Sequence, residues 1–176
     1  MSEHNPYATP QAQVADPLLT GGPAELAGRG TRLGAALIDG AIGFGVSWPI
    51  FSALGIWQQA RSPQAQDPSF LLTVLVLGVL LFLALHGYLL KKNGQTIGKR
   101  LLGIRIVTLE GDVPPFGKLI GLRYLPLMVV SVIPIPLIQI AGLIDALFIF
   151  RADRRCVHDL MAGTRVIVAR TSQVST

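Results

Sequence analysis

Charged residues are scarce in this sequence. Asp, Glu, Lys and Arg make up 14% of its 176 residues, whereas soluble domains carry about a quarter. Cysteine is almost absent: Cys156 is the only one, which excludes an intramolecular disulfide and cannot build a metal site alone. The N-terminal residues also lack a basic segment followed by an apolar one, so no cleaved signal peptide is predicted. These absences argue against a soluble domain and against a disulfide-stabilised one.

Long apolar runs fill most of the chain instead. They cover residues 33–57, 70–90 and 119–150. A membrane-spanning helix needs about 20 predominantly apolar residues to cross roughly 30 Å of hydrocarbon, and each run meets that length. The mean hydropathy of +0.53 agrees with this interpretation. The sequence therefore predicts an all-α integral membrane protein, a small polytopic helical bundle with two full spans formed by the first two runs.

The third run contains a break. Pro134 and Pro136 cannot maintain the hydrogen bonds of a helix interior, so they separate a leg at residues 119–133 from a leg at residues 137–150. A single crossing would also place the Arg-rich C-terminus on the side opposite to the other basic segment. We predict a Pro-broken helical hairpin, and its two legs either cross the membrane fully or form a re-entrant pair.

Two short segments outside the runs have strand character. Residues 102–108 and 164–169 are rich in β-branched side chains and are bounded by turn residues. Both are predicted on the same side of the membrane. They can pair into a small cytoplasmic β ribbon, and the alternative is that they are independent loops.

Basic residues are distributed unevenly along the chain, which has a formal net charge of +5. They crowd residues 91–123 and the C-terminal segment, whereas the connection at residues 58–69 contains only Arg61. The positive-inside rule then predicts cytoplasmic N- and C-termini and an external 58–69 connection. Because the basic residues flank spans and lack interleaved aromatic residues, we expect no nucleic-acid partner.

The chain divides into three parts by composition. Residues 1–28 contain four prolines and few large apolar side chains, so they predict a disordered N-terminal tail. Residues 29–170 form the membrane domain, and residues 171–176 are expected to be a flexible C-terminus.

Ionisable residues inside the spans are the candidate functional residues, because charge is costly in lipid. Arg32 and Asp39 share one face of the first span with the small residues Ala36 and Gly43. Asp39 must find a donor, become protonated or bind a cation. It is therefore either part of a buried ion pair that fixes helix packing or an ion or proton site. His86, near the end of the second span, could exchange protons or serve only in packing.

Enzyme chemistry is not indicated. The sequence has no nucleophile with a nearby base, no metal-ligand spacing and no paired carboxylates. We therefore predict a protein that is not an enzyme, with no catalytic residue, no cofactor and no metal site.

Three segments together carry a family resemblance. Residues 32–39, 94–107 and 158–164 resemble, in order, the motifs of the RDD family of bacterial membrane proteins, and the resemblance extends over about residues 28–169. The family is named for one arginine and two aspartates, which by motif correspond to Arg32, Asp39 and Asp159. Asp145 resembles an acidic position found in part of the family and is the alternative second aspartate. The 29–170 domain is thus RDD-like.

The resemblance implies a multi-pass protein of the bacterial inner membrane. A transport role has been proposed for the family, and some members resemble cation/proton antiporters. We therefore expect a polar cluster of Arg32, Asp39 and Asp159 that moves a monovalent cation or proton, with His86 and Asp145 as secondary residues. The expected partners are the lipid bilayer, the cation or proton, and a second copy of the chain. The alternative is a non-transporting scaffold or accessory subunit in which the cluster is structural.

Overall fold

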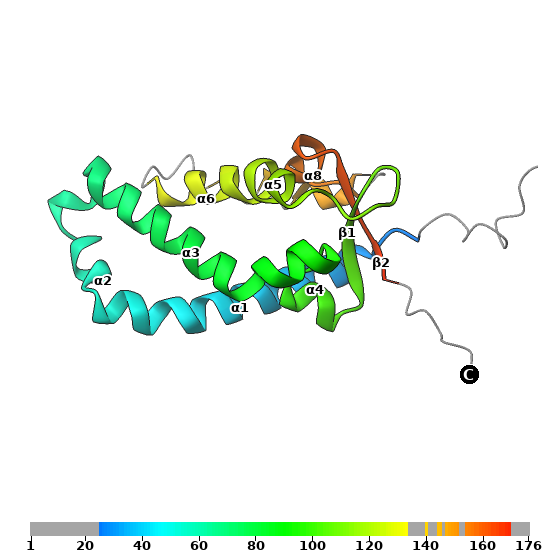
Figure 1. Cartoon of the computed structure of the whole chain (residues 1–176). Coiled ribbons are helices and arrows are strands. Elements are labelled where there is room, and N and C mark those ends of the chain that lie inside the picture. The colour runs from blue at the N-terminus through cyan, green and yellow to red at the C-terminus, as the bar shows by residue number, and fades with distance from the viewer. Residues whose placement is uncertain (1–24, 134–139, 141–143, 146, 152–153, 170–176) are drawn as a thin grey trace, which may run out of the picture.

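The computed structural model describes residues 25–133, 140, 144–145, 147–151 and 154–169. This part of the chain is mostly helical and contains one two-stranded sheet. Figure 1 shows an elongated molecule with the short helix α2 (Ile56–Gln59) at one end and the strands β1 (Ile104–Thr108) and β2 (Thr164–Val168) at the other. We call these the loop end and the ribbon end.

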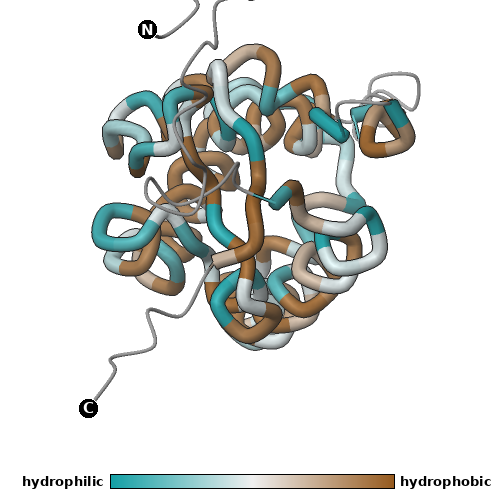
Figure 2. Tube along the Cα trace, turned by 90° about the vertical axis from the view of Figure 1, so that its right-hand side faces the viewer, coloured by the Kyte–Doolittle hydropathy of each residue, from teal (hydrophilic) through white to brown (hydrophobic). Residues whose placement is uncertain are grey.

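Two long helices run along the molecule. They are α1 (Arg29–Ala53) and α3 (Pro68–Asn93), and both are long and apolar enough to cross a membrane. Only 6% of the most apolar window of each is buried inside the structure. The core helix of a soluble protein would be mostly buried, so these helices present their apolar side chains outward, as lipid exposure requires. Figure 2, viewed along the long axis, shows that hydrophobic residues are frequent along the helices. The two predicted long apolar helices are confirmed.

The ends of α3 follow from its flanking residues. The Asp67 side chain accepts a hydrogen bond from the backbone N–H of Ser69 at 2.8 Å, and Pro68 occupies the first helical position. Gly94 ends the helix with a left-handed φ of 65°. A Cβ atom there would lie 2.5 Å from the carbonyl oxygen of Ile106, so glycine is needed both for the turn and for the close approach of β1.

The predicted ribbon is present as an antiparallel pair. Its register places Ile104 opposite Val168 and Thr108 opposite Thr164, which excludes the alternative of independent loops. Leu26 also pairs with Ile167 on the outer side of β2. Residues 25–28, which the composition assigned to the disordered tail, thus take part in the fold, because their backbone groups complete the hydrogen bonding of β2.

The third apolar run begins as a continuous helical segment. It comprises α5 (Phe116–Lys118), the π-helix η2 (Leu119–Tyr124) and α6 (Leu125–Val132). The first predicted leg is therefore helical. Pro134, Pro136 and most of the second leg lie outside the described residues, and of that leg the structure gives the short 3-10 helix η3 (Phe148–Phe150).

The buried core lies at the ribbon end. There the first turns of α1 and the last turns of α3 meet the ribbon and η2. Its members are Ala27, Ala35, Leu90, Ile104, Ile106, Leu119 and Val166. Away from this core α1 and α3 are largely exposed, so the ribbon end is the part of the fold that positions polar side chains rigidly.

Candidate functional site

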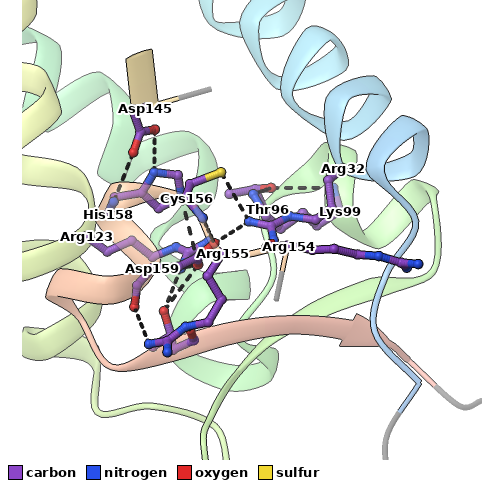
Figure 3. A network of polar contacts seen from close by, with 11 residues as sticks. Arg32, Thr96, Lys99, Arg123, Asp145, Arg154, Arg155, Cys156, His158 and Asp159 are labelled. Carbon is purple, nitrogen blue, oxygen red and sulfur yellow. Dashed lines mark hydrogen bonds and ion pairs between the residues drawn. The ribbon is translucent and has the colours of Figure 1, made fainter. Parts of the chain in front are cut away.

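A buried aspartate is the centre of the first polar site. Asp159 lies in the short helix α8 (Val157–Met161) and is fully buried. Its carboxylate accepts hydrogen bonds from the guanidinium groups of Arg32 and Arg123 (Figure 3). The backbone N–H of Cys156 also donates a hydrogen bond to this carboxylate, at 3.1 Å. We call Arg32, Asp159 and Arg123 the Arg–Asp–Arg cluster.

Three separate elements supply this cluster. Arg32 comes from the first turn of α1, and it also donates to the backbone carbonyl of Arg154. Arg123 comes from η2 and donates to the Thr164 hydroxyl at 2.6 Å, at the start of β2. Since all three charged side chains are at most 8% exposed, the cluster ties α1, η2, α8 and β2 together inside the protein.

The electrostatics of the cluster fix the charge of Asp159. Burial alone would raise the pKa of its carboxyl group, but the guanidinium groups of Arg123 and Arg32 outweigh burial and hold the pKa well below its usual range. The two arginines therefore favour the ionised form of Asp159. The cluster holds two positive charges and one negative charge, so Asp159 acts as the counter-ion of both arginines.

Asp39 belongs to a second polar site. Its carboxylate accepts hydrogen bonds from the Thr96 hydroxyl at 2.5 Å and from the backbone N–H of Gly98 at 2.7 Å. The Nδ1 atom of His86 lies 3.9 Å from the same carboxylate, and it accepts the backbone N–H of Ile97 at 3.4 Å. We call Asp39, His86, Thr96 and Gly98 the Asp39 site.

This second site joins the two spans through a short helix. Thr96 is the N-cap of α4 (Ile97–Leu101), and its hydroxyl accepts the backbone N–H of Lys99 at 3.4 Å. Asp39 thus receives hydrogen bonds from the first turn of α4, where unpaired N–H groups favour a negative charge. Gly98 permits the approach of α1, because a Cβ atom there would lie 2.3 Å from the carbonyl oxygen of Ala35.

A cavity extends from the Asp39 site toward the loop end. It has a volume of about 620 Å³ and lies between α1, α3 and α6. Asp39 and His86 line it at the ribbon end, and Trp57 and Phe70 line it near the loop end. Among the described residues that line it, Asp39 is the only acidic one and His86 the only basic one.

The three residues predicted as one cluster divide between these two sites. Arg32 and Asp159 contact each other directly. Asp39 is not among the described contacts of Arg32 or Asp159. Its hydrogen-bond partners are Thr96 and Gly98. His86, predicted as a secondary residue, lies beside Asp39.

Asp145, the other secondary residue, binds α8. Its carboxylate accepts the backbone N–H of His158 at 2.9 Å and lies 2.6 Å from the Nδ1 atom of that ring. Burial lowers the pKa of His158 and Arg123 lowers it further, whereas the hydrogen bond to Asp145 opposes them. Asp145 therefore caps the first turn of α8 and helps to place Asp159.

Ligand atoms of Asp145, Cys156 and His158 lie within 4.8 Å of one another, which is close enough to consider a metal ion. However, an Arg32 nitrogen lies 3.6 Å from the Cys156 sulfur, and this positive charge opposes a divalent cation. Burial also raises the pKa of the Cys156 thiol to about 11, and metals bind the thiolate. We assign these three residues to the support of α8.

Sequence reasoning missed Arg123, Thr96 and Gly98. Arg123 carried a signal, since an arginine inside an apolar run needs a buried partner. Thr96 and Gly98 carried none beyond their place in a family motif, because their role depends on the packing of α4 against α1.

The sequence of this chain is similar to those of two uncharacterized bacterial proteins. The chain is 39% identical over 144 residues to the uncharacterized protein YckC of Bacillus subtilis, covering 81% of this chain and 85% of that protein. It is 33% identical over 93 residues to an uncharacterized protein of Haemophilus influenzae, covering 52% of this chain and 56% of that protein. No solved structure matches. The RDD family matches residues 26–163, and the chain therefore belongs to the RDD family.

Proposed function

We propose that this RDD protein exchanges a cation for a proton across the bacterial inner membrane, and that Asp39 and His86 are the exchange groups. One observation carries the proposal: the carboxylate and the imidazole lie 3.9 Å apart where the 620 Å³ cavity between the spans ends. An ionisable pair inside a membrane span, facing a cavity, marks ion and proton pathways.

Competition for one carboxylate provides the mechanism. Asp39 is held by two neutral donors, Thr96 and Gly98, so a cation or a proton can still neutralise its charge. A cation that enters the cavity displaces the proton from Asp39, and His86 receives it at Nδ1, which releases the hydrogen bond from the Ile97 N–H as it does so. Lys99, whose Nζ atom lies 3.5 Å from the Thr96 hydroxyl, brings a positive charge close to this site.

The Arg–Asp–Arg cluster has a different role in this proposal. Its aspartate is permanently ionised and paired, and it does not line the cavity. We infer that the cluster holds the ribbon end together while Asp39 and His86 exchange the proton. We propose that this end and both termini lie in the cytoplasm, a side that the basic residues beside the ribbon favour by the positive-inside rule.

Flux measurements on reconstituted protein test the proposal. Full-length protein is placed in liposomes that contain a pH-sensitive dye and an acidic interior, and sodium, potassium, lithium or an organic ammonium ion is added outside. We expect wild type to dissipate the pH gradient with at least one cation. Asp39→Asn and His86→Gln should abolish this flux while they elute and melt like wild type.

A matched control removes an acid elsewhere. Asp112→Asn alters an exposed carboxylate in the loop after β1 and should transport like wild type. If wild type dissipates no gradient with any of the cations, or if Asp39→Asn transports normally, the exchange proposal is wrong.

A membrane scaffold is the second candidate function. It is favoured by the complete burial and mutual pairing of the Arg–Asp–Arg cluster, which contributes to packing and faces no cavity. On this alternative, variants of Arg32 or Asp159 lower stability and assembly, whereas Asp39→Asn is tolerated and wild type shows no flux.

A further inference from the structure

The chemistry of the cavity wall restricts which cation can bind there. Channels and transporters that bind alkali ions replace the hydration shell with several oxygen ligands. Among the described residues that line the cavity, Asp39 supplies the only charged oxygen ligands, and its carboxylate already accepts hydrogen bonds from Thr96 and Gly98. The Ser47 hydroxyl lines the same cavity but donates to a carbonyl of its own helix at 3.4 Å. This wall is poorly suited to a dehydrated sodium or potassium ion.

The remainder of the wall is suited to an apolar body. Aliphatic and aromatic side chains predominate, and the aromatic ones are Phe51, Trp57, Phe70 and Phe82. Aromatic faces also attract organic cations. A volume of about 620 Å³ lies within the range of roughly 300 to 1,000 Å³ that holds a drug-sized molecule.

Glycines on both spans keep this space open. Gly40 and Gly43 of α1 and Gly78 of α3 line the cavity, and a Cβ atom added at any of them would meet nothing within 4 Å. A methyl group at these positions would therefore meet no clash, and we expect a longer side chain there to take up part of the cavity. Replacing one of these glycines by a larger residue is therefore a way to fill the cavity.

We propose that the cavity binds a lipophilic organic cation, an ammonium ion with aromatic or alkyl substituents. Its charged centre lies beside Asp39 and its apolar body lies between α1 and α3. The inference rests on the proposed function, because it names the class of cation that the Asp39 site takes. A neutral lipid chain or a helix of a second copy would fill the apolar part but would bring no positive charge to the cavity side of the Asp39 carboxylate.

Direct binding tests this assignment. The full chain is purified in an uncharged detergent and titrated with ethidium, an aromatic quaternary cation, against empty micelles. A neutral aromatic probe, N-phenyl-1-naphthylamine, is titrated in parallel. We expect saturable ethidium binding that Asp39→Asn weakens about tenfold or more, with binding of the neutral probe unchanged. That pattern separates charge recognition from partition into an apolar space.

Two leucine substitutions on one helix supply the matched comparison. Gly43→Leu fills the cavity, whereas Gly45→Leu lies on the exposed side of α1, where an added Cβ also meets nothing within 4 Å. Both replace glycine by the same residue in α1. We expect Gly43→Leu to weaken ethidium binding about tenfold or more and Gly45→Leu to change it by less than about twofold.

Each alternative occupant predicts a different result. Equal weakening of both probes by Gly43→Leu, with no effect of Asp39→Asn, would mean that the cavity takes neutral lipid. Conversion of a dimer to a monomer by Gly43→Leu, without ethidium binding, would assign the cavity to a second copy. Either result overturns the inference, as does an absence of ethidium binding to wild type.

Failure of the inference and failure of the proposed function are distinguishable. Alkali-ion flux without ethidium binding would leave the exchange proposal standing and refute the organic-cation class. Ethidium binding that depends on Asp39 and Gly43, without flux of any cation, would support the binding site and refute exchange.

Discussion

Removing the charge of Asp159 should be the most damaging conservative change in this protein. Asp159→Asn keeps the shape of the side chain but leaves Arg32 and Arg123 buried without a counter-ion; Asp159 is 0% exposed, Arg123 1% and Arg32 8%. Breaking a buried ion pair by removal of one partner costs about 3 to 5 kcal/mol. Both arginines lose their partner here, so we expect a loss of that order in the free energy of unfolding.

Removing one arginine should cost less. In Arg32→Gln the carboxylate keeps Arg123, and in Arg123→Gln it keeps Arg32, so no buried charge is left alone. Each of these variants loses a hydrogen bond to a charged group, worth about 1.5 to 3 kcal/mol. The combination of Asp159→Asn with Arg123→Gln should recover part of the loss caused by Asp159→Asn, because one of the two unpaired cations is removed.

Cys156 provides the assay. It is the only cysteine, it is buried and it contacts the cluster. A thiol-reactive fluorescent dye therefore reports unfolding from one site. A loss of 3 to 5 kcal/mol should lower the melting midpoint by roughly 6 to 20 °C in a chain of this size. If the Asp159→Asn midpoint matches that of wild type, or if either single arginine variant melts lower than Asp159→Asn, the account of the cluster is wrong.

Three further predictions concern pH, topology and helix contact. Because the pKa of Asp159 is lowered in the folded protein, this residue stabilises the fold above about pH 4, and the stabilisation is lost on acidification. Between about pH 5 and about pH 3 the melting midpoint should therefore fall more in wild type than in Asp159→Asn. In a cysteine-free background, an impermeant maleimide should label Arg61→Cys in intact spheroplasts and Asp112→Cys only in inverted vesicles; the reverse pattern would refute the orientation. Gly98→Ala should destabilise by about 1 to 3 kcal/mol in a thermal melt, since its Cβ would lie 2.3 Å from a backbone oxygen of α1, whereas Gly40→Ala should be neutral or stabilising.

The topology experiment needs introduced cysteines because of a structural result. The native thiol is unsuited to this test, because Cys156 is 5% exposed and packed beside Arg32. A lack of labelling at Cys156 would then report burial as much as membrane side. Arg61 and Asp112 are both exposed, at the loop end and the ribbon end respectively, so they report the side alone.

Features that depend on local sequence were predictable. The two spans were expected at residues 33–57 and 70–90, and the helices run over Arg29–Ala53 and Pro68–Asn93. The length of each apolar run determines the helix, and Asp67 and Gly94 cap the two ends of α3. The ribbon was expected at residues 102–108 and 164–169, and the strands occupy Ile104–Thr108 and Thr164–Val168. β-branched composition and the flanking turn residues indicated both segments, but the choice between a paired ribbon and independent loops came from the structure.

The pairing of charged residues was less predictable, because it depends on contacts between distant segments. Helical spacing places Arg32 and Asp39 on one face of α1, roughly 10 Å apart along the axis. That spacing leaves each free to meet a different neighbour. Arg32 lies at the start of α1, against α8, whereas Asp39 lies about two turns further along, against α4. Which neighbour each one meets is decided by the folding of α4 and α8.

The two aspartates therefore differ in what a change of protonation would cost. Asp159 neutralises two buried guanidinium groups, so a proton on it would leave both without a counter-ion, and its charge is fixed. Asp39 is held by a hydroxyl and a backbone N–H, both of which are neutral. Protonation there weakens two hydrogen bonds but leaves no buried cation unpaired. Asp39 lines the cavity and Asp159 does not, so the proposed exchange is assigned to Asp39.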